Sequence, residues 1–594
     1  MERTNRSDRG NRSLIKEMYR LSFLTMMVSI MLGTLGGVID GVIVGRCMGS
    51  EAMASYGLVS SISPLLMMLG SIVISGASLM CARCMSIADT ESANGIFSLS
   101  IVIGTVVAII YTGAIVLFSA PIIRFLGAKD SEALLYHEAH AYLIGLSFGF
   151  IFAMGSMILH PYISLEGDRK RTVIEVLIII AVNITCDLVN VYLLKGRMFG
   201  IGLATSLSQL VGFMVSLSHF MKGRSIFKFR PSGIAWRKTA DLLSGGLPMA
   251  VNRICYVAKV VWLNRIVLSI AGTVALSAIS IQNNLNNFLS LISLSTAMSL
   301  MSCTGILEGE KNKSSLRILF KTGVKSGVLI NLMMTVVVFV FAGQLADIYA
   351  KGNVEVGAYA ISALRFFACG LVFLVIVQSY ICFLLGLGKK RLVVFFMILH
   401  NLLFPILCAL FAGKAFGIDG VWLSFAMGEM LMLAAIFVTV LIRDRRIPKD
   451  LDDYLLLKGE YDISDDMLRE WTFSEQSDVV NTSEEARIFL KGKGIDDRRS
   501  MLTALCIEEM TGNILSYGKR DGRKLCVYER LVVTEDDLIL RIRDNGVHFD
   551  PVEWIELYKS DDRTSNIGIR MICGMAKDFR YVNTMGMNNL IITI

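Results

Sequence analysis

The sequence predicts an all-α polytopic membrane protein with twelve transmembrane helices in two six-helix bundles, followed by a small α/β sandwich domain. The chain has 594 residues, of which 54% are hydrophobic and only 18% are charged, a balance that excludes a soluble globular protein of this length. Apolar segments long enough to cross a bilayer recur as far as residue 442. Beyond that point charged residues become frequent and apolar runs shorten, which indicates a second kind of domain.

The apolar segments form two groups of six, separated by a basic loop at Lys222–Lys238. We place them at about 21–45, 57–80, 96–123, 141–164, 173–194 and 200–220, then at about 245–270, 277–304, 323–347, 358–386, 392–413 and 416–442. Lys and Arg are concentrated in the loops on the side of the N-terminus, so we expect a multi-pass cell-membrane protein with both termini in the cytoplasm. No cleavage site follows the first apolar run, which we therefore expect to be retained as a span.

One apolar segment, Val173–Leu194, carries polar residues at membrane depth. Asn183 and Asp187 are four residues apart and so share one helix face, which Asn190 extends. A carboxylate in a span is unfavourable unless it faces a cavity, a partner or an ion. The segment therefore predicts either the cation-coupling site of a secondary transporter or a polar contact that joins two helices.

The two groups of spans repeat each other. Gly49–Ala52 after the first span matches Gly272–Ala275 after the seventh, and Lys195–Ile201 before the sixth matches Ala412–Ile418 before the twelfth. The offset between matching stretches stays at about 220 residues. Each half has an even number of spans, so both copies enter the membrane from the same side. Duplications of this kind are typical of transporters in which two bundles rock about a central site.

With these motifs in place, residues 14–442 resemble the multidrug and toxic compound extrusion (MATE) family, within a superfamily that also holds polysaccharide and lipid-linked precursor flippases. The stretches that carry the resemblance are Asp40–Arg46, with Gly49 and Ala52, and Gly200–Thr205. The resemblance implies two six-helix bundles, a V-shaped central cleft, and export of small organic or amphipathic compounds, driven by H⁺ or Na⁺, within a lipid membrane.

The branch that this chain resembles, that of the DNA-damage-inducible (DinF-like) and archaeal members, implies a coupling site in the first bundle. There Asp40 on the first span would face Asn183 and Asp187 on the fifth, with Thr205 on the sixth. The two acids lie at similar depth, each a few residues before the basic residue that ends its span. Two carboxylates that close would share a proton or a cation. His160 on the fourth span would either join this path or be a structural, hydrogen-bonded histidine.

Basic residues distinguish the second bundle. Arg253 and Lys259 lie in the seventh span and Arg365 in the tenth, where a cation should face the cleft or a partner such as Glu429. We predict that they form a basic wall of the substrate cleft, which leaves amphipathic, anionic and lipid-linked substrates open. The alternative is internal ion pairing.

The charged C-terminal part of the chain, the tail beyond residue 465, carries a second set of motifs. A predicted helix, Ser500–Tyr517, places Glu509 and Asn513 on one face, a strand pair ends in the box Asp544–Asp550, and Gly568 opens a later helix. This order resembles the GHKL ATPase domain, particularly the RsbW-like anti-sigma-factor kinases.

That resemblance implies a Mg-ATP site. Asn513 would ligate Mg²⁺, Glu509 would be the general base, and Asp544 would accept from the adenine amino group. Gly546 would let the base approach the backbone and Gly568 would offer helix N–H groups to phosphate. Asn566 stands where the family usually has a lid glycine, which puts lid closure in doubt.

We therefore predict a cation-coupled exporter with a fused cytoplasmic ATP-binding domain that regulates it and that could act as a serine kinase. The predicted parts are a tail at 1–13, bundles at 14–222 and 223–442, a linker at 443–465 and the GHKL-like domain at 466–594. The rival hypotheses are a membrane-anchored signalling protein with an anti-sigma-type switch, and a flippase for a lipid-linked precursor. We expect no nucleic-acid partner; an anti-sigma-pathway protein and a second copy of the chain are possible partners of the tail.

Overall fold

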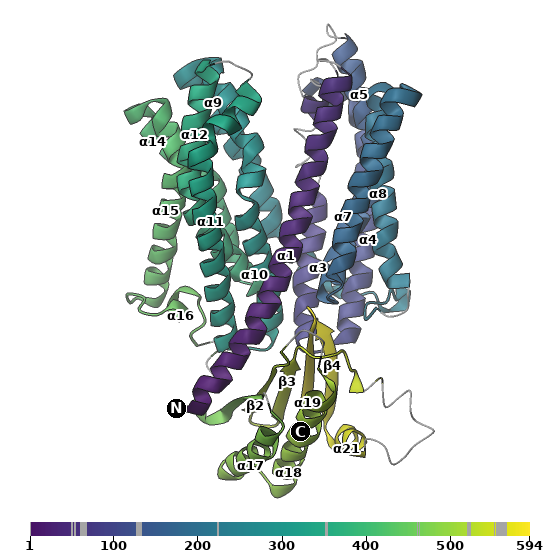
Figure 1. Ribbon diagram of the computed structural model, residues 1–594, viewed down its shortest axis with the longest axis vertical. Coiled ribbons are helices and arrows are strands. Elements are labelled where there is room, and N and C mark those ends of the chain that lie inside the picture. Colours follow the sequence, from purple (N-terminus) through teal and green to yellow (C-terminus); the bar gives the residue numbers. More distant parts are fainter. Residues whose placement is uncertain are drawn as a thin grey trace.

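The computed structural model describes residues 2–48, 52, 55–59, 68–125, 133–221, 225–350, 354–459, 461, 464–473, 475–519, 524–551, 553 and 567–594. Two helical bundles stand side by side above a small domain with a β-sheet, and both chain termini lie at the end that holds this domain (Figure 1). We call residues 464–594 the tail domain.

The first bundle is built from long helices that alternate in direction. Its elements are α1 (Glu2–Cys47), α3 (Met68–Ser86), α4 (Thr90–Phe125), α5 (Ala133–Ser147), α6 (Phe150–Leu165), α7 (Arg169–Val189), the π-helical turn η1 (Asn190–Leu194) and α8 (Arg197–Met221). The helices α5 and α6 meet at a bend of 45° and are together long and apolar enough for one span. Short helical turns, η2 (Pro231–Gly233) and η3 (Trp236–Lys238), lead to the second bundle.

The second bundle repeats this plan. Its elements are α9 (Thr239–Leu289), α10 (Leu291–Gly309), α11 (Lys313–Ala350), α12 (Val354–Gly386), α13 (Lys390–Ile398), η4 (Leu399–Leu403), α14 (Phe404–Phe416) and α15 (Ile418–Asp444). The backbone breaks inside α9 at Gly272, whose φ of +69° suits glycine. A π-helical turn occurs in the fifth span of each half, at different places: η1 ends the span, whereas η4 lies between α13 and α14.

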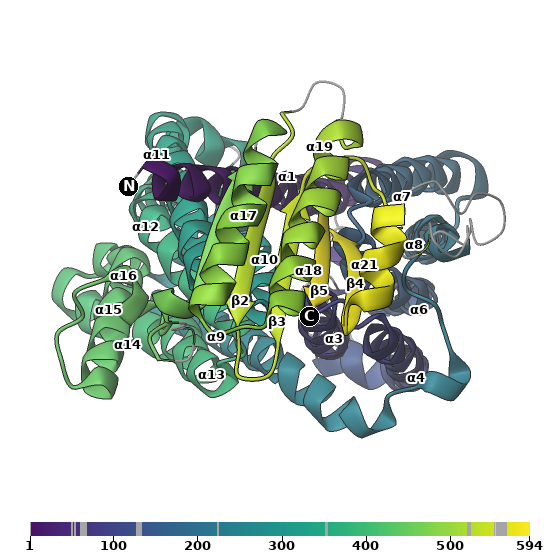
Figure 2. The ribbon, with the colours of Figure 1, turned by 90° about the horizontal axis from the view of Figure 1, so that it is seen from below.

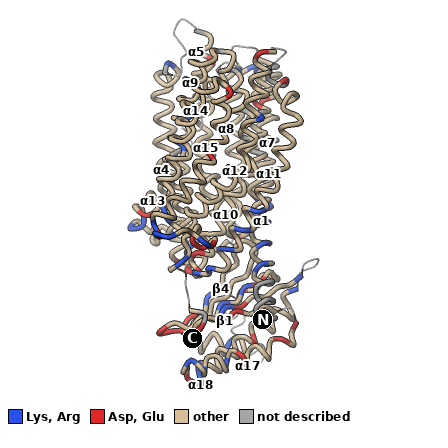
Figure 3. The backbone as a smooth tube through the Cα atoms, turned by 90° about the vertical axis from the view of Figure 1, so that its left-hand side faces the viewer, with Lys and Arg blue, Asp and Glu red and all other residues tan. Residues whose placement is uncertain are grey.

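By length and composition, eleven helices in the described residues can cross a membrane, or twelve when the bent pair counts as one span. This agrees with the twelve predicted spans. Large apolar side chains remain exposed on the outer surfaces of the bundles, as a lipid environment requires. Lys and Arg gather at the helix ends that adjoin the tail domain (Figure 3).

The bundles meet at the end that adjoins the tail, which we call the inner end, and their far ends stand apart (Figure 1). Glycines permit this contact. A Cβ on Gly76 of α3 would overlap the carbonyl oxygen of Leu242 in α9, and a Cβ on Gly246 would overlap that of Ile72. Because only glycine allows such close backbone approach, the inner end is closed by packing of α3 against α9 and α10.

The tail domain is a five-stranded antiparallel sheet in the order β1-β2-β3-β5-β4, with helices on the face away from the bundles (Figure 2). The strands are β1 (Leu468–Phe473), β2 (Val527–Val533), β3 (Leu538–Asp544), β4 (Asp578–Thr584) and β5 (Met587–Thr593). The helical elements are α17 (Ser477–Gly492), α18 (Asp497–Cys506), η6 (Ile507–Thr511), α19 (Gly512–Tyr517) and α21 (Ile567–Met575), preceded by η5 (Asp465–Met467). The strand pair predicted before the box Asp544–Asp550 is present as β2 and β3.

Both faces of this sheet are buried. Along β2 and β3, residues such as Leu531 and Leu540 enter a core shared with the tail helices. Residues that point to the opposite face, such as Tyr528 and Ile591, join the core of the bundles. Since side chains alternate between the faces of a strand, one set holds the domain together and the other holds it against the membrane part.

The predicted linker is packed against the bundles rather than extended. It forms the short helix α16 (Leu451–Tyr454), in which Asp452 pairs with Arg317 of α11 and Asp453 lies 2.7 Å from Lys458. Its leucines at 455–457 are buried. The described linker residues 443–459 thus lie against the inner ends of α11 and α15.

Candidate functional site

The structure brings Asp40 of α1 and Asp187 of α7 together inside the first bundle. Both side chains are buried, and their carboxyl groups lie within hydrogen-bonding reach of each other. Among the described residues, no amide or hydroxyl group donates to either carboxyl oxygen of Asp187 or to Oδ1 of Asp40. A buried carboxylate without donors is unfavourable, so the pair can be satisfied by a shared proton or a bound cation.

Polar and aromatic groups complete this cluster. Asn183 donates from Nδ2 to Thr205 Oγ1 across 3.5 Å, which joins α7 to α8 one turn from Asp187. The rings of Tyr56 and Tyr142, 5.6 Å apart, lie close enough to the two acids to feel their charge. The four residues predicted from the sequence are thus brought together, and the two tyrosines are additions that no local pattern indicated.

Asn190 lies two turns beyond Asn183 and also faces α8. It begins the π-helical turn η1, accepts from the Gly196 amide at 3.1 Å, and donates to the Arg197 carbonyl oxygen at 3.0 Å. Its side chain fills the space beside Gly200, where a Cβ would overlap it. The helix is still regular at Asn190, whose amide donates to the Cys186 carbonyl oxygen, so Asn190 continues the face of Asn183 as predicted, but its side chain binds the loop before α8 and not the acid pair.

His160 contacts a different acid. Its Nε2 lies 2.8 Å from Glu175 Oε2 at the inner part of α7, and Ser216 donates to the same oxygen. Asp187 is twelve residues further along α7, or about 18 Å at the helical rise. The histidine therefore has the hydrogen-bonded position expected of a structural residue, remote from the acid pair.

The three predicted basic residues of the second bundle have different surroundings. Arg253 and Arg365 are exposed, and among the described residues they form no ion pair. Lys259 lies over the ring of Tyr256, 5.0 Å from its centroid. Glu429 contacts His400 Nε2 at 2.9 Å and lies close enough to Lys259 to act on its charge, whereas among the described residues it forms no ion pair with Arg253 or Arg365.

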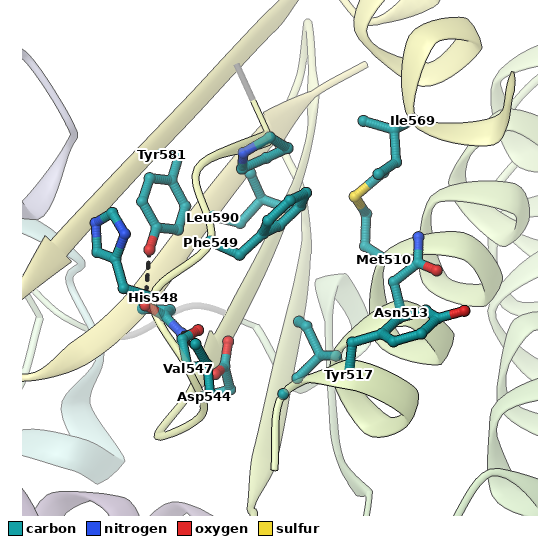
Figure 4. Close-up of a pocket in the computed structure, with 14 residues that line it drawn as sticks. Met510, Asn513, Tyr517, Asp544, Val547, His548, Phe549, Ile569, Tyr581 and Leu590 are labelled. Carbon is teal, nitrogen blue, oxygen red and sulfur yellow. Dashed lines mark hydrogen bonds between the residues drawn. The ribbon is translucent and has the colours of Figure 1, made fainter. Parts of the chain in front are cut away.

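The tail domain contains a pocket of about 400 Å³ between its helices and its sheet (Figure 4). Its lining includes two of the predicted nucleotide residues, Asn513 and Asp544, and the apolar side chains of Met510, Ile569 and Leu590. This volume is typical of small-ligand sites. The pocket therefore combines apolar side chains with polar ones: the Asp544 carboxylate, the amides of Asn513 and Asn588, and His548.

Hydrogen bonds hold the Asp544 side chain in place. Its Oδ1 accepts from the Gly546 amide at 2.7 Å and from Asn588 Nδ2 at 2.8 Å, and Tyr581 donates to Asn588. A Cβ at Gly546 would lie 2.7 Å from the Gly518 carbonyl oxygen, so the box backbone runs close to the end of α19. This fixed carboxylate suits recognition of an exocyclic amino group such as that of adenine.

The remaining predicted tail residues lie at the neighbouring end of the helices. A Cβ on Gly568, at the start of α21, would overlap the carboxyl group of Glu509. Glu509 and Asn513 thus share the helical stretch η6–α19, one beside α21 and one in the pocket wall. Asn566 lies outside the described residues.

The family model described as MatE matches residues 25–189 and 248–410, one stretch in each bundle and together more than half of the chain. The chain belongs to the MatE family. The matched stretches are the two copies of the internal repeat, and they include Asp40, Asn183 and Asp187. The model ends before the tail domain, so family membership concerns the helical bundles.

Known relatives of this MatE protein cover the same part. It is 23% identical over 448 residues to the multidrug export protein MepA of Staphylococcus saprophyticus. The matched region covers 73% of this chain and 95% of MepA. Its fold matches a multidrug resistance MATE transporter of the MOP superfamily in an outward-facing conformation, with a TM-score of 0.68, 21% identity, and 73% and 97% of the two chains covered. It also matches a MOP superfamily transporter from Pyrococcus furiosus, described with a binding pocket of reverse polarity, with a TM-score of 0.66, 22% identity, and 73% and 97% covered.

Proposed function

We propose that this MatE protein is a cation-coupled antiporter that exports small organic or amphipathic compounds, with a tail domain that binds Mg-ATP and regulates it. The observation that carries the transport part is the buried pair Asp40–Asp187, in which both oxygens of Asp187 and Oδ1 of Asp40 lack amide or hydroxyl donors within the described chain. Multidrug export by relatives such as MepA supports the choice of substrate class.

The acid pair provides the switch. Two carboxylates in contact at membrane depth repel when both are charged, so a proton or Na⁺ between them stabilises the pair. Binding of the cation draws α1 and α7 together, and its release lets the two helices adjust. Coupling follows if the cation and the substrate favour opposite arrangements of the bundles. The tyrosines Tyr56 and Tyr142 shield the pair from water.

Efflux from proteoliposomes under an imposed H⁺ or Na⁺ gradient tests this proposal. We expect Asp187→Asn and Asp40→Asn each to reduce gradient-driven efflux of a cationic dye at least about tenfold, since a neutral amide cannot exchange the cation. Asp419→Asn, which alters an exposed acid at the start of α15, is the matched control and should transport normally. Undiminished efflux in both acid variants would refute coupling through this pair.

The basic residues of the second bundle favour a second substrate class. Arg253 and Arg365 have exposed guanidinium groups without ion pairs in the described chain, which suits amphipathic anions or the phosphate groups of lipid-linked precursors. The Pyrococcus furiosus relative with a pocket of reverse polarity supports this alternative. Arg253→Gln and Arg365→Gln should then impair transport of an anionic probe more than that of a cationic one.

The tail pocket is the basis for the regulatory part. Asp544 and Asn513 would hold adenine and Mg²⁺, and Glu509 would activate a nucleophile if phosphoryl transfer occurs. We expect Asp544→Asn in the full-length protein to weaken Mg-ATP binding by about 10- to 100-fold, as judged by calorimetry. Asp536→Asn in the exposed β2–β3 turn is the control. Equal affinities would argue against this nucleotide site, and phosphorylation of a partner serine without transport would favour the signalling hypothesis.

A further inference from the structure

Strands β2 and β3 gather three arginines on the face of the sheet that points toward the bundles. Their register places Arg530 directly opposite Arg541, and Arg543 lies two residues further along the same face. Like charges opposed across two strands repel each other. The cluster therefore requires an anionic partner, and among the described residues of the tail only Arg530 of the three approaches one, Glu470, at 3.4 Å.

The anionic partner comes from the second bundle. Glu310 lies in the loop between α10 and α11 with only 1% of its side chain exposed; Arg541 Nη1 is 3.1 Å from its Oε1, and Arg543 pairs with its Oε2. Arg530 donates to the Glu310 backbone carbonyl at 2.9 Å. Burial by itself raises the pKa of Glu310, but Arg543 and Arg541 outweigh burial and hold that pKa below its ordinary value. The carboxylate stays ionised at the centre of the cluster.

The same face also contacts the first bundle. Arg541 Nη1 donates to the carbonyl oxygen of Ser86, the last residue of α3, at 2.9 Å. In the β4–β5 turn, Thr584 Oγ1 and the Met585 amide donate to the Leu165 carbonyl oxygen at the end of α6, at 3.1 and 2.9 Å. Carbonyl groups at helix C-termini carry partial negative charge and attract cations. One guanidinium group thus joins α3 of the first bundle to Glu310 of the second.

The helices α3 and α10, next to Ser86 and Glu310, also close the inner end of the bundles. The helices α3 and α10 pack against each other, and Arg83 of α3 pairs with Glu308 of α10 one turn from the arginine cluster. If the bundles separate at this end, Ser86 and Glu310 must move apart. Arg541 cannot follow both, so opening requires that the tail release at least one of them.

We propose that the tail domain is a clamp on the inner end of the transporter, in which Arg541 and Arg543 hold Ser86 and Glu310 together and so restrain opening toward the cytoplasm. This inference rests on the proposed function insofar as it assumes transport by alternate opening of the two bundles. It specifies how the tail regulates: release of the arginine face permits the inner end to open, and docking keeps it closed.

Distances between spin labels on the full-length protein test the clamp. Labels on non-canonical residues at Lys170 and Arg391, exposed at equivalent inner positions of the two bundles, report the inner opening. We expect Glu310→Arg to add a population at longer distance, and Glu310→Arg with Arg543→Glu to restore the distribution of the parent protein. Glu484→Arg makes the same charge change on exposed α17 and should leave the distances unchanged.

Native cysteines report docking and folding in the same samples. Cys526 Sγ contacts the Gly10 carbonyl of α1 at 3.6 Å and should react faster with a maleimide when the tail is released. Cys506 lies in the tail core and should stay protected. A faster Cys526 reaction with unchanged distances overturns the clamp, as does a protected Cys526 in Glu310→Arg. If Cys506 becomes reactive in Glu310→Arg, the tail core has unfolded and Arg541→Gln is measured in its place. A population at longer label distance in Arg541→Gln supports the clamp, and its absence refutes it.

The outcomes separate this inference from the transport proposal. Label distances can be measured without a transported substrate. The clamp can therefore be tested whether all variants transport or none does. If the clamp holds while Asp187→Asn transports normally, the coupling proposal alone fails. If Asp187→Asn abolishes efflux while the distances ignore Glu310→Arg, the clamp alone fails.

Discussion

Arg83 of α3 and Glu308 of α10 form an ion pair of 3.0 Å that joins the two bundles at their inner end. Their side chains are 37% and 18% exposed, so solvent screens the pair and its contribution is small. The pair lies between the glycine contacts of α3 with α9 and the arginine cluster of the tail. Three neighbouring sets of contacts therefore hold the inner end closed: the glycine contacts, this ion pair and the arginine cluster.

Removal of the Arg83–Glu308 pair should destabilise the closed inner end slightly. We expect Arg83→Gln, Glu308→Gln and the double variant to shift the closed–open equilibrium by about 0.5 kcal/mol, with little further effect in the double variant. The Lys170–Arg391 label distance measures the shift. Additive effects of the two single changes would show that the residues act independently.

A methyl group at Gly246 should open the inner end more strongly. Its Cβ would overlap the Ile72 carbonyl oxygen of α3, and such overpacking costs about 1–3 kcal/mol. We expect Gly246→Ala to populate the open inner end, as seen by the same labels. Gly343→Ala in α11, where the added Cβ would meet nothing within 4 Å, is the matched control. An unchanged distance distribution in Gly246→Ala would mean that the helices adjust without separating.

In the tail, Gly568→Ala should displace Glu509, whose carboxyl group occupies the space of the new Cβ. If the pocket binds Mg-ATP, we expect its affinity to fall several-fold, and any hydrolysis to fall further. Gly574→Ala on the same helix places its Cβ in open space and should bind as the parent does, with slightly higher stability. Calorimetry with the full-length protein compares the two variants.

Tail stability should decrease with rising pH because of Glu529. Its side chain is fully buried beneath Thr511, and burial raises its pKa to about 8 from an ordinary 4.5. The folded tail thus favours the neutral acid: the stabilisation is complete below the ordinary pKa and is lost as pH rises through about 8. Glu529→Gln should remove this dependence, a change of a few kcal/mol at high pH.

Proteolysis of the full-length protein in urea, on both sides of that pH window, measures this effect. Glu535→Gln in the exposed β2–β3 turn is the control and should retain the pH dependence of the parent. If Glu529→Gln lost tail stability at every pH, the carboxyl proton would be serving a specific hydrogen bond that an amide cannot replace.

Much of the architecture could be predicted because it depends on local and periodic patterns. Apolar segments of sufficient length set the spans, and the repeat near about 220 residues set the two bundles. The pairing of Asp40 with Asp187 followed from similar depth and family resemblance. Tyr56 and Tyr142 could not be predicted as their neighbours, since nothing in the sequence orients aromatic side chains in the spans toward one interior point.

Periodicity placed Asn190 on the face of Asn183 but did not give its partners. Seven residues beyond Asn183 an α-helix returns to the same face, and there the side chain bonds to Gly196 and Arg197 in the loop before α8. The partners of Glu429 also depend on helix rotation, which the sequence does not give. His400 contacts it and Lys259 feels its charge, while Arg253 and Arg365 are exposed.

The sequence by itself determined that this chain spans a membrane many times, that its helical part is duplicated, and that a mixed α/β domain follows. These properties depend on hydropathy, spacing and alternation, which are local. Only the tertiary structure decided that the tail sheet packs its second face against both bundles and that Arg541 meets Ser86 and Glu310. These contacts join residues hundreds of positions apart, and their geometry exists only once every helix has taken its place.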